Sequence, residues 1–156
     1  MYRYKVFFEE GVLLTQFYDE YLEHEGDKSL LAICKSMTID ERHSIKTVIW
    51  DLQDVTAMTV ANTDIARVAY FERELLKMFE KPGTGIAKHM SEVSIFYIQP
   101  EDSAVGDIFR ERLARVARTT RKTPTLDGEE PRGLPELLES LKLSKLLPSL
   151  DGEWQE

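Results

Sequence analysis

The run Thr47–Leu52 constrains the fold more than any other feature of the chain. Its sequence, Thr-Val-Ile-Trp-Asp-Leu, is almost continuously apolar, which is typical of a strand covered on both faces. Val93–Ile98 is a second run of this kind, and it ends before Pro100. The sequence therefore predicts a sheet whose central strands lie between layers of helices.

The beginning of the chain predicts a β-hairpin. Tyr2–Phe8 and Val12–Tyr18 are aromatic and β-branched runs, and only Glu9-Glu10-Gly11 separates them. A connection of that length joins antiparallel neighbours. After the hairpin we expect a short helix capped by Asp27, followed by a loop over Thr38–Ser44.

Longer helices are predicted on either side of Val93–Ile98. Asn62 or Thr63 caps a helix that runs to about Glu80, where Pro82-Gly83 ends it. A second helix covers the stretch from Ala104 to about Arg121, with Ser103 or Asp102 as its cap.

The last third of the chain offers weaker signals. Lys122–Leu126 is a strand candidate, and Pro124 places it at a sheet edge. Pro135 suits the first turn of a helix through Leu143. The predicted fold is α/β: a single mixed, mostly parallel sheet of about five strands with an N-terminal antiparallel hairpin and flanking helices.

Composition limits the function classes. The chain has 156 residues and a net charge of −8, which suits one domain and disfavours nucleic-acid binding. No apolar run reaches the ~18 residues of a membrane span, and no signal peptide is recognisable. The one cysteine, Cys34, cannot form an intramolecular disulfide, so we expect a cytoplasmic location.

The element order, together with two local motifs, resembles the SpoIIAA-like family of the sulfate-transporter and anti-sigma-antagonist (STAS) fold. One motif is Asp51-Leu52-Gln53-Asp54-Val55-Thr56, followed by Thr63-Asp64-Ile65-Ala66 at the next helix. The other is Ile98-Gln99-Pro100-Glu101-Asp102, followed by Val105-Gly106 and Phe109. The resemblance covers roughly Tyr4–Leu141.

This resemblance implies a non-catalytic regulatory module that acts through protein-protein contacts. The Asp-Ser-Ser-Gly phosphorylation motif of the anti-sigma antagonists falls on Thr59-Val60-Ala61-Asn62 here. The serines are absent, so the phospho-switch does not carry over. The fold also resembles lipid-transfer domains, which leaves a carrier of a small apolar or lipid ligand as the alternative.

Ligands of open α/β sheets usually bind at the carboxyl ends of the strands. Asp51 and Asp54 lie there, where they could recognise a hydroxyl or an amine or merely cap a loop. We predict a recognition loop over Val55–Thr63, and its candidate contact residues are Asp54, Thr56, Thr59 and Asn62.

Several motifs support neither catalysis nor a cofactor. Gly83–Lys88 lacks the preceding strand and the Gly-Lys-Ser/Thr ending of a phosphate loop. His24, His43 and His89 have no metal-ligand spacing and are expected on the surface. No nucleophile, base and oxyanion donors can be assembled, so we predict no enzyme, no metal and no cofactor.

Basic residues gather between Val105 and Lys122, with six of them against two acidic ones. The face carrying Arg110, Arg118 and Arg121 is either an ordinary solvated surface or a docking strip for an acidic partner or lipid headgroups.

Two charged residues fall on apolar helix faces. Glu72 lies between Val68 and Leu76, and Arg112 has a similar position on its own helix. Buried charges require partners. Glu72 is therefore predicted either to pair with Arg112, or with a tyrosine such as Tyr97, or to emerge at a gap in the packing.

Two leucine sets end the chain, each with i, i+3, i+4, i+7 spacing. The first belongs to the domain over residues 1–143, and the second belongs to an extension over 144–156. On one continuous helix the two sets would face opposite sides. Either the chain turns back near Leu143-Ser144, or the second set forms a homodimer, and we favour the homodimer because an exposed stripe of four leucines is unusual on a monomer. The second set is Leu143, Leu146, Leu147 and Leu150.

Overall fold

A single mixed sheet organises the chain. The computed structural model describes residues 1–22, 24–59, 65–79, 93–117 and 133–156. Its strands lie in the order β1-β2-β3-β4, with β1 antiparallel to β2 and the other pairs parallel. Their bounds are Tyr2–Phe7, Val12–Tyr21, Thr47–Met58 and Ser94–Ile98.

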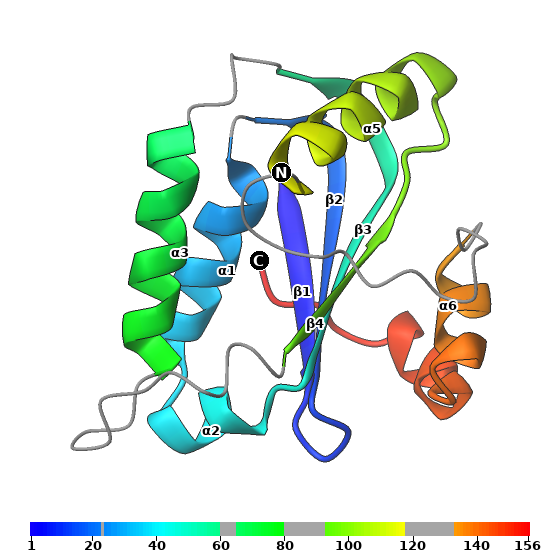
Figure 1. The fold of residues 1–156 in the computed structure, drawn as a ribbon. Coiled ribbons are helices and arrows are strands. Elements are labelled where there is room, and N and C mark those ends of the chain that lie inside the picture. Colours follow the sequence, from blue (N-terminus) through cyan, green and yellow to red (C-terminus); the bar gives the residue numbers. More distant parts are fainter. Residues whose placement is uncertain (23, 60–64, 80–92, 118–132) are drawn as a thin grey trace.

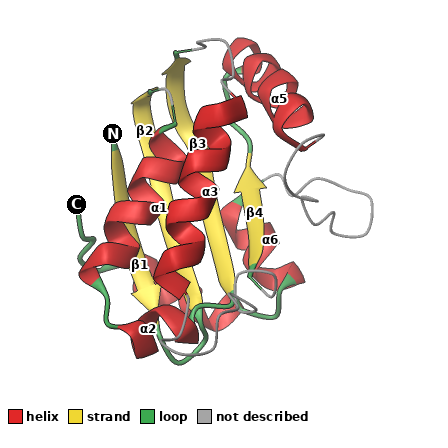
Figure 2. Cartoon of the chain, turned by 60° about the vertical axis from the view of Figure 1, so that its left-hand side comes forward, coloured by secondary structure: helices red, strands yellow, loops and turns green. Residues whose placement is uncertain are grey.

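Helices cover both faces of the sheet (Figures 1 and 2). Two lie on one face, α1 (Glu25–Ser36) and α3 (Ile65–Phe79), with α2 (Ile39–Ser44) below them in Figure 1. α5 (Ser103–Ala117) packs beside the far end of β3. The short helix α6 (Leu134–Ser140) and the 3₁₀ helix η1 (Ser144–Asp151) cover the opposite face.

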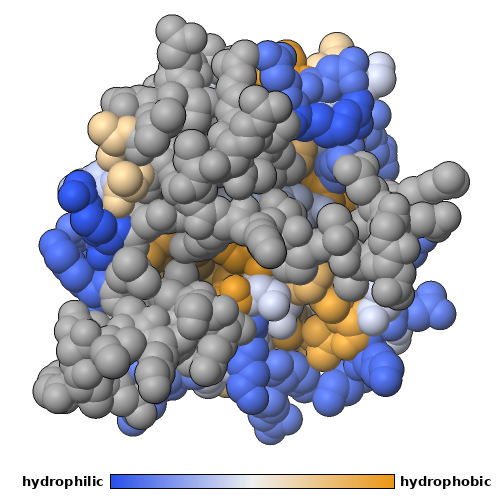
Figure 3. Space-filling view, in the orientation of Figure 1, coloured by the Kyte–Doolittle hydropathy of each residue, from blue (hydrophilic) through white to orange (hydrophobic). Residues whose placement is uncertain are grey.

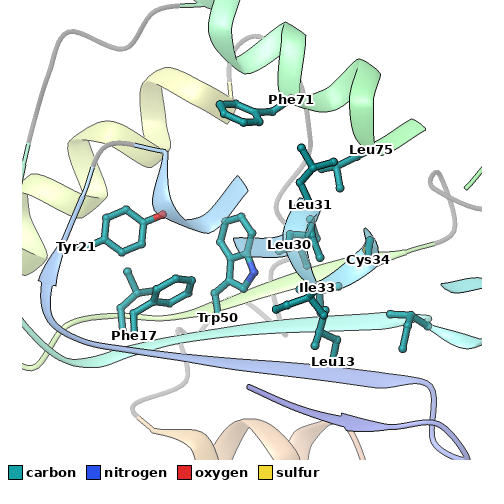
Figure 4. Close-up of a cluster of buried hydrophobic side chains, with 14 of the residues drawn as sticks. Leu13, Phe17, Tyr21, Leu30, Leu31, Ile33, Cys34, Trp50, Phe71 and Leu75 are labelled. Carbon is teal, nitrogen blue, oxygen red and sulfur yellow. The ribbon is translucent and has the colours of Figure 1, made fainter. Parts of the chain in front are cut away.

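The larger core lies between the sheet and α1, α3 and α5 (Figure 4). Phe17 is fully buried, and its ring meets those of Tyr21 and Trp50 edge-on, with ring centroids 5.1 and 6.2 Å apart. The N–H of Gly26 donates to the Tyr21 hydroxyl at 2.9 Å. The start of α1 is thereby held against the aromatic rings of the sheet.

The second core lies under α6 and η1. Ile49 and Leu14 from the sheet meet Leu137 and Leu138 from α6, and all four are at most 1% exposed. In Figure 3, hydrophobic side chains are visible to the lower right of centre, on the side of the sheet where α6 and η1 lie in Figure 1. Because Val48 faces the other core, the prediction that Thr47–Leu52 is covered on both faces is confirmed.

The two central strands of the sheet, β2 and β3, are parallel to each other, and we call them the central pair. Both are longer than predicted. β2 continues to Tyr21 and β3 to Met58, so Val55–Met58 is strand and not loop. The register shows why: β3 advances from Asp51 to Asp54 while β2 advances only from Gln16 to Tyr18. An extra residue of this kind is a β-bulge, and it breaks the alternation that marks a strand in the sequence.

Two predictions around α1 and α2 were wrong. α1 begins at Glu25 after His24, whose φ is 57°, so Asp27 is inside the helix and does not cap it. The expected loop contains α2, capped by Thr38. The Thr38 hydroxyl accepts from Glu41 N, and the Glu41 carboxylate accepts from Thr38 N, each at 3.2 Å. This reciprocal pair is a capping box.

The remaining elements agree with the prediction where they are described, except that the helix predicted through Leu143 ends at Ser140. Asp102 caps α5, since its carboxylate accepts from Val105 N at 3.0 Å. The strand candidate Lys122–Leu126 lies outside the described residues, which contain four strands against the about five predicted. Asn62 and Thr63 also lie outside them.

The last leucines fold back. After α6 the chain reverses at Lys142, whose φ is 59°, and Leu143 N donates to Leu138 O at 2.7 Å. Leu146 is 4% exposed, and its three companions are partly buried against the same core as α6: Leu143, Leu147 and Leu150. These leucines therefore form no exposed stripe. The expectation of a homodimer depended on such a stripe, and the folded-back tail replaces it.

Candidate functional site

A row of polar side chains crosses the sheet on the α6 and η1 face. Arg3, Gln16 and Asp51 are register partners on β1, β2 and β3. Arg3 Nε donates to Gln16 Oε1 at 2.7 Å, and Gln16 Nε2 reaches Asp51 Oδ2 at 3.3 Å. The other oxygen of Asp51 accepts from Gln53 N at 3.0 Å. The row links three strands through side chains on the face that carries the second core.

Burial dominates the chemistry of Asp51. The residue is 2% exposed. Loss of water raises the pKa of its carboxyl from 3.8 to about 6, and the nearby charges of Asp54 and Glu101 act in the same direction. The hydrogen bonds from Gln53 N and Gln16 act against this rise. Asp51 is therefore enclosed and satisfied by its amide partners, as expected for a structural carboxylate.

The raised pKa of Asp51 predicts how the free energy of unfolding changes with pH. A folded-state pKa of about 6 against 3.8 means that folding favours the protonated carboxyl. The stabilisation is complete below pH 3.8 and is lost as the pH rises through about 6, for a total of about 3 kcal/mol. Asp51→Asn should remove this loss. Its free energy of unfolding, relative to the parent chain, should rise by about that amount between pH 4 and pH 7 in urea titrations.

Asp54→Asn is the matched control, because Asp54 lies on the same strand but is exposed. It should shift the pH dependence much less. If the two variants show the same difference from the parent chain at every pH, Asp51 is not the group that burial perturbs.

Beyond the end of β4 the central pair continues as a two-stranded extension (Figure 2). We call its exposed polar side chains the acidic ribbon. One face of the extension is anchored in the larger core through Val55 and Tyr21, which are 0% and 6% exposed. The ribbon consists of Asp19, Glu20, Asp54, Thr56 and Thr59.

Hydrogen bonds tie the acidic ribbon together. Thr56 Oγ1 donates to Asp19 O, and Thr59 Oγ1 donates to Glu20 Oε1, both at 3.2 Å. Thr59 N donates to Tyr21 O at 3.0 Å. Asp19, Glu20, Asp54 and Thr56 therefore lie on paired strands and not on a loop, and Thr59 directly follows β3. This corrects the predicted recognition loop for Asp54 and Thr56.

The ribbon also gains acidic neighbours from the end of β4. Glu101 N donates to Gln53 O at 3.2 Å, which ties the Pro100-Glu101-Asp102 turn to β3. Glu101 and Asp102 are exposed. Carboxylates from the ends of three strands thus meet at one edge of the sheet. Asp19 and Glu20 had not been predicted as candidates, since nothing in their local sequence indicates that they pair with β3.

The other predicted site residues do not join this surface. Arg110 donates to Gln99 Oε1 at 2.7 Å and forms an ion pair with Asp107. Its charge is thus partly used within its own surroundings. Arg118 and Arg121 lie outside the described residues, as do the side chains of Glu72 and Arg112.

Two reactive residue types are buried. Cys34 is 1% exposed, and burial raises the pKa of its thiol to about 12, which disfavours the nucleophilic thiolate. His24 was expected on the surface but is also 1% exposed, with its ring 5.5 Å from that of Phe71. Both residues contribute to packing around α1.

A cleft lies at the outer edge of the sheet, beside β1. Its volume is about 640 Å³, and it was not predicted. It forms where β1, the end of α1, α2 and the C-terminal segment come together, and residues so far apart in the chain carry no local signal. Four apolar and four polar residues line it: Tyr4, Val6, Phe8, Met37, Ser36, Glu41, Gln155 and Glu156.

The sheet order and the helix layers define an α/β protein with one mixed sheet. Within the described ranges, no helix is long and apolar enough to span a membrane.

The comparisons with known proteins find similarity among solved structures. No protein-family model matches the chain, and no curated protein matches it. Among solved structures, the chain is similar to the anti-sigma factor antagonist SpoIIAA in its unphosphorylated form. The match has 10% identity and a TM-score of 0.43, and it covers 81% of this chain and 90% of that one. The sequence pattern resembles the SpoIIAA-like family, whose name includes that of this protein. At 10% identity, the match assigns no role to any residue.

Proposed function

We propose that the chain is a non-catalytic regulatory module that binds a partner protein through the acidic ribbon. One observation carries this proposal. β2 and β3 extend beyond the end of β4, and this paired extension presents five exposed polar side chains. Strands anchored in a core hold such side chains in fixed positions. A partner then pays little ordering entropy for this surface on binding.

The charge of the surface defines the partner. Asp19, Glu20 and Asp54 lie on the ribbon, and Glu101 and Asp102 lie beside it. The whole chain has a net charge of −8, so its field attracts basic proteins and accelerates their encounter. We therefore infer a partner with a basic contact surface.

The buried reactive groups support binding over catalysis. The Cys34 thiol is held in its protonated form, and Asp51 is enclosed by amide partners. A protonated, unpaired cysteine also suits a reducing compartment, and we place the module in the cytoplasm. A lipid carrier, the alternative, needs a mainly apolar cavity. Among the described residues the candidate is the cleft beside β1, and half of its lining is polar.

Site-specific photo-crosslinking tests the proposal. A photoreactive side chain at Thr56 should crosslink a basic protein in cells, and the same group at Lys28, exposed on α1, should not. With the captured partner, Asp54→Lys and Glu20→Lys should each weaken binding at least tenfold, because they place like charges in contact. The free energy of unfolding should change by less than about 0.5 kcal/mol.

Glu153→Lys is the matched control, since Glu153 is an exposed acid on the tail. It changes the net charge equally but leaves the ribbon intact. If it weakens binding as much as Asp54→Lys, the overall charge and not the ribbon drives the interaction. A partner that binds both ribbon variants unchanged would refute the proposal.

A further inference from the structure

The outer edge of β1 already holds a piece of extended chain. Tyr4 N donates to Gln155 O at 2.8 Å, and Gln155 N donates to Tyr4 O at 3.0 Å. The two residues form an antiparallel bridge. The C-terminal segment lies beside β1 in both ribbon views (Figures 1 and 2).

The bridge uses only part of the edge. In an antiparallel pair, residues alternate between those bonded to the neighbouring strand and those pointing away from it. Tyr4 points away from β2, so Tyr2 and Val6, two residues to either side, point away as well. Within the described part of the chain, no hydrogen bond reaches the outward N–H or C=O of Tyr2 or Val6. The edge therefore has room for a longer strand than the bridge supplies.

The cleft runs along this same edge. Val6 and Phe8 line it from the strand side, and Met37 lines it from the end of α1. Phe8 is 44% exposed, so its ring is open to an incoming side chain. Glu41 and Glu156 add two carboxylates to the lining. The cleft thus offers contact area for an apolar side chain with negative charge next to it.

We propose that the β1 edge binds an extended peptide segment of another protein as an added antiparallel strand. The segment takes the register that Gln155 holds now and bonds to Tyr2, Tyr4 and Val6. Strand addition of this kind draws affinity from main-chain hydrogen bonds and specificity from pockets for alternate side chains. The segment places an apolar side chain against Phe8 and Met37, and a lysine or arginine beside Glu41.

The structure favours Gln155 as an exchangeable competitor. Gln155 and Glu156 are exposed, and the Gln155 backbone meets β1 through the two bonds to Tyr4. Trp154 is held independently: its Nε1 donates to Leu150 O at 3.0 Å, and its ring lies 4.7 Å from Arg3 Cζ. Gln155 can therefore leave the edge while Trp154 stays in place.

This surface is distinct from the acidic ribbon. It lies on β1, an outer strand of the sheet, whereas the ribbon lies on β2 and β3, and its recognition uses backbone groups and a cleft. The two proposals therefore fail or succeed independently.

A random decapeptide library displayed on phage and selected against the full-length Gln155→Pro chain tests the proposal. Proline at 155 removes the donor to Tyr4 O and frees the edge. We expect enriched peptides with apolar residues at alternate positions and at least one basic residue. A fluorescent copy of such a peptide should bind Gln155→Pro about tenfold more tightly than the parent chain, because one of the two competing hydrogen bonds is lost and the other is left without its neighbour.

Val6→Pro in the Gln155→Pro chain should weaken the peptide at least tenfold. It removes an outward N–H without touching the ladder to β2, and edge strands tolerate proline. Val6→Thr is the matched control, since it keeps both the N–H and the side-chain volume, and it should bind as before. If Val6→Pro lowers the melting temperature, amide exchange at Val6 in the Gln155→Pro chain replaces it, and the peptide should slow that exchange.

Three results would overturn the proposal. The selection could yield no binding peptide. Binding could be equal in Val6→Pro and Val6→Thr, or Val6 could show no protection from exchange. Sedimentation could show that Gln155→Pro dimerises without peptide, in which case a second copy of the chain occupies the edge.

Discussion

Leu137→Ala should cost about 2–5 kcal/mol of the free energy of unfolding. Leu137 is 0% exposed at the centre of the second core, where it packs with Leu14 and Ile49 of the sheet. The substitution removes the transfer energy of the leucine and leaves a cavity that α6 cannot close. The cavity lies under α6, which packs between the sheet and η1 in the second core. The C-terminal segment should therefore also lose packing contacts.

Urea denaturation followed by tryptophan fluorescence measures this effect. Trp154 reports the tail and Trp50 reports the larger core, so single-tryptophan variants separate the two regions. Glu136→Ala is the control, because it lies exposed on the same helix and should change the free energy of unfolding by less than about 0.5 kcal/mol. If Leu137→Ala behaves like this control, the tail is not packed on the sheet in solution.

Gly26→Ala should destabilise the protein even though alanine is the better helix former. A Cβ at position 26 would lie 2.6 Å from the Tyr21 hydroxyl and 2.8 and 2.9 Å from two ring carbons of Trp50. Both rings are buried, so neither can move aside without disturbing Phe17. Overpacking of this kind costs about 1–3 kcal/mol, and the rigid rings place Gly26→Ala at the upper end.

Gly106→Ala gives the opposite sign and serves as the matched control. Gly106 lies inside α5, and the nearest atoms to an added Cβ are 3.5 and 3.6 Å away. The ordinary propensity gain of about 0.5–1 kcal/mol should therefore appear. Thermal unfolding of the two variants side by side decides the matter: a stabilised Gly26→Ala would mean that α1 sits further from Trp50.

The strands and helices with strong local signals could be predicted. The hairpin follows from two aromatic and β-branched runs around a short connection, and the cover on both faces of β3 follows from its apolar run. The predictions failed where the local pattern was broken. The bulge after Asp51 places Val55 on the buried face and breaks the alternation of side chains. The sequence pattern therefore predicted a loop from Val55, where the structure continues β3 to Met58.

The candidate surface could be predicted only in part. Asp54, Thr56 and Thr59 were found because acids and hydroxyls follow a central strand. Asp19 and Glu20 were missed, because β2 reaches them only by pairing with the bulged end of β3. The cleft beside β1 has no local signal at all, since its lining comes from opposite ends of the chain.

Elements whose hydrophobic period is complete within a few residues could be predicted from the sequence, because side-chain spacing and turn residues act locally. Features that depend on residues far apart in the chain became visible only in the folded structure. The same leucine spacing could form a dimer face or a folded-back tail, and the positive φ of Lys142 turned Leu146 into the second core. Burial raised the pKa of Asp51, and the bridge from Gln155 to Tyr4 joined the two ends of the chain. Burial and long-range pairing arise from contacts between distant segments, and a single sequence shows neither.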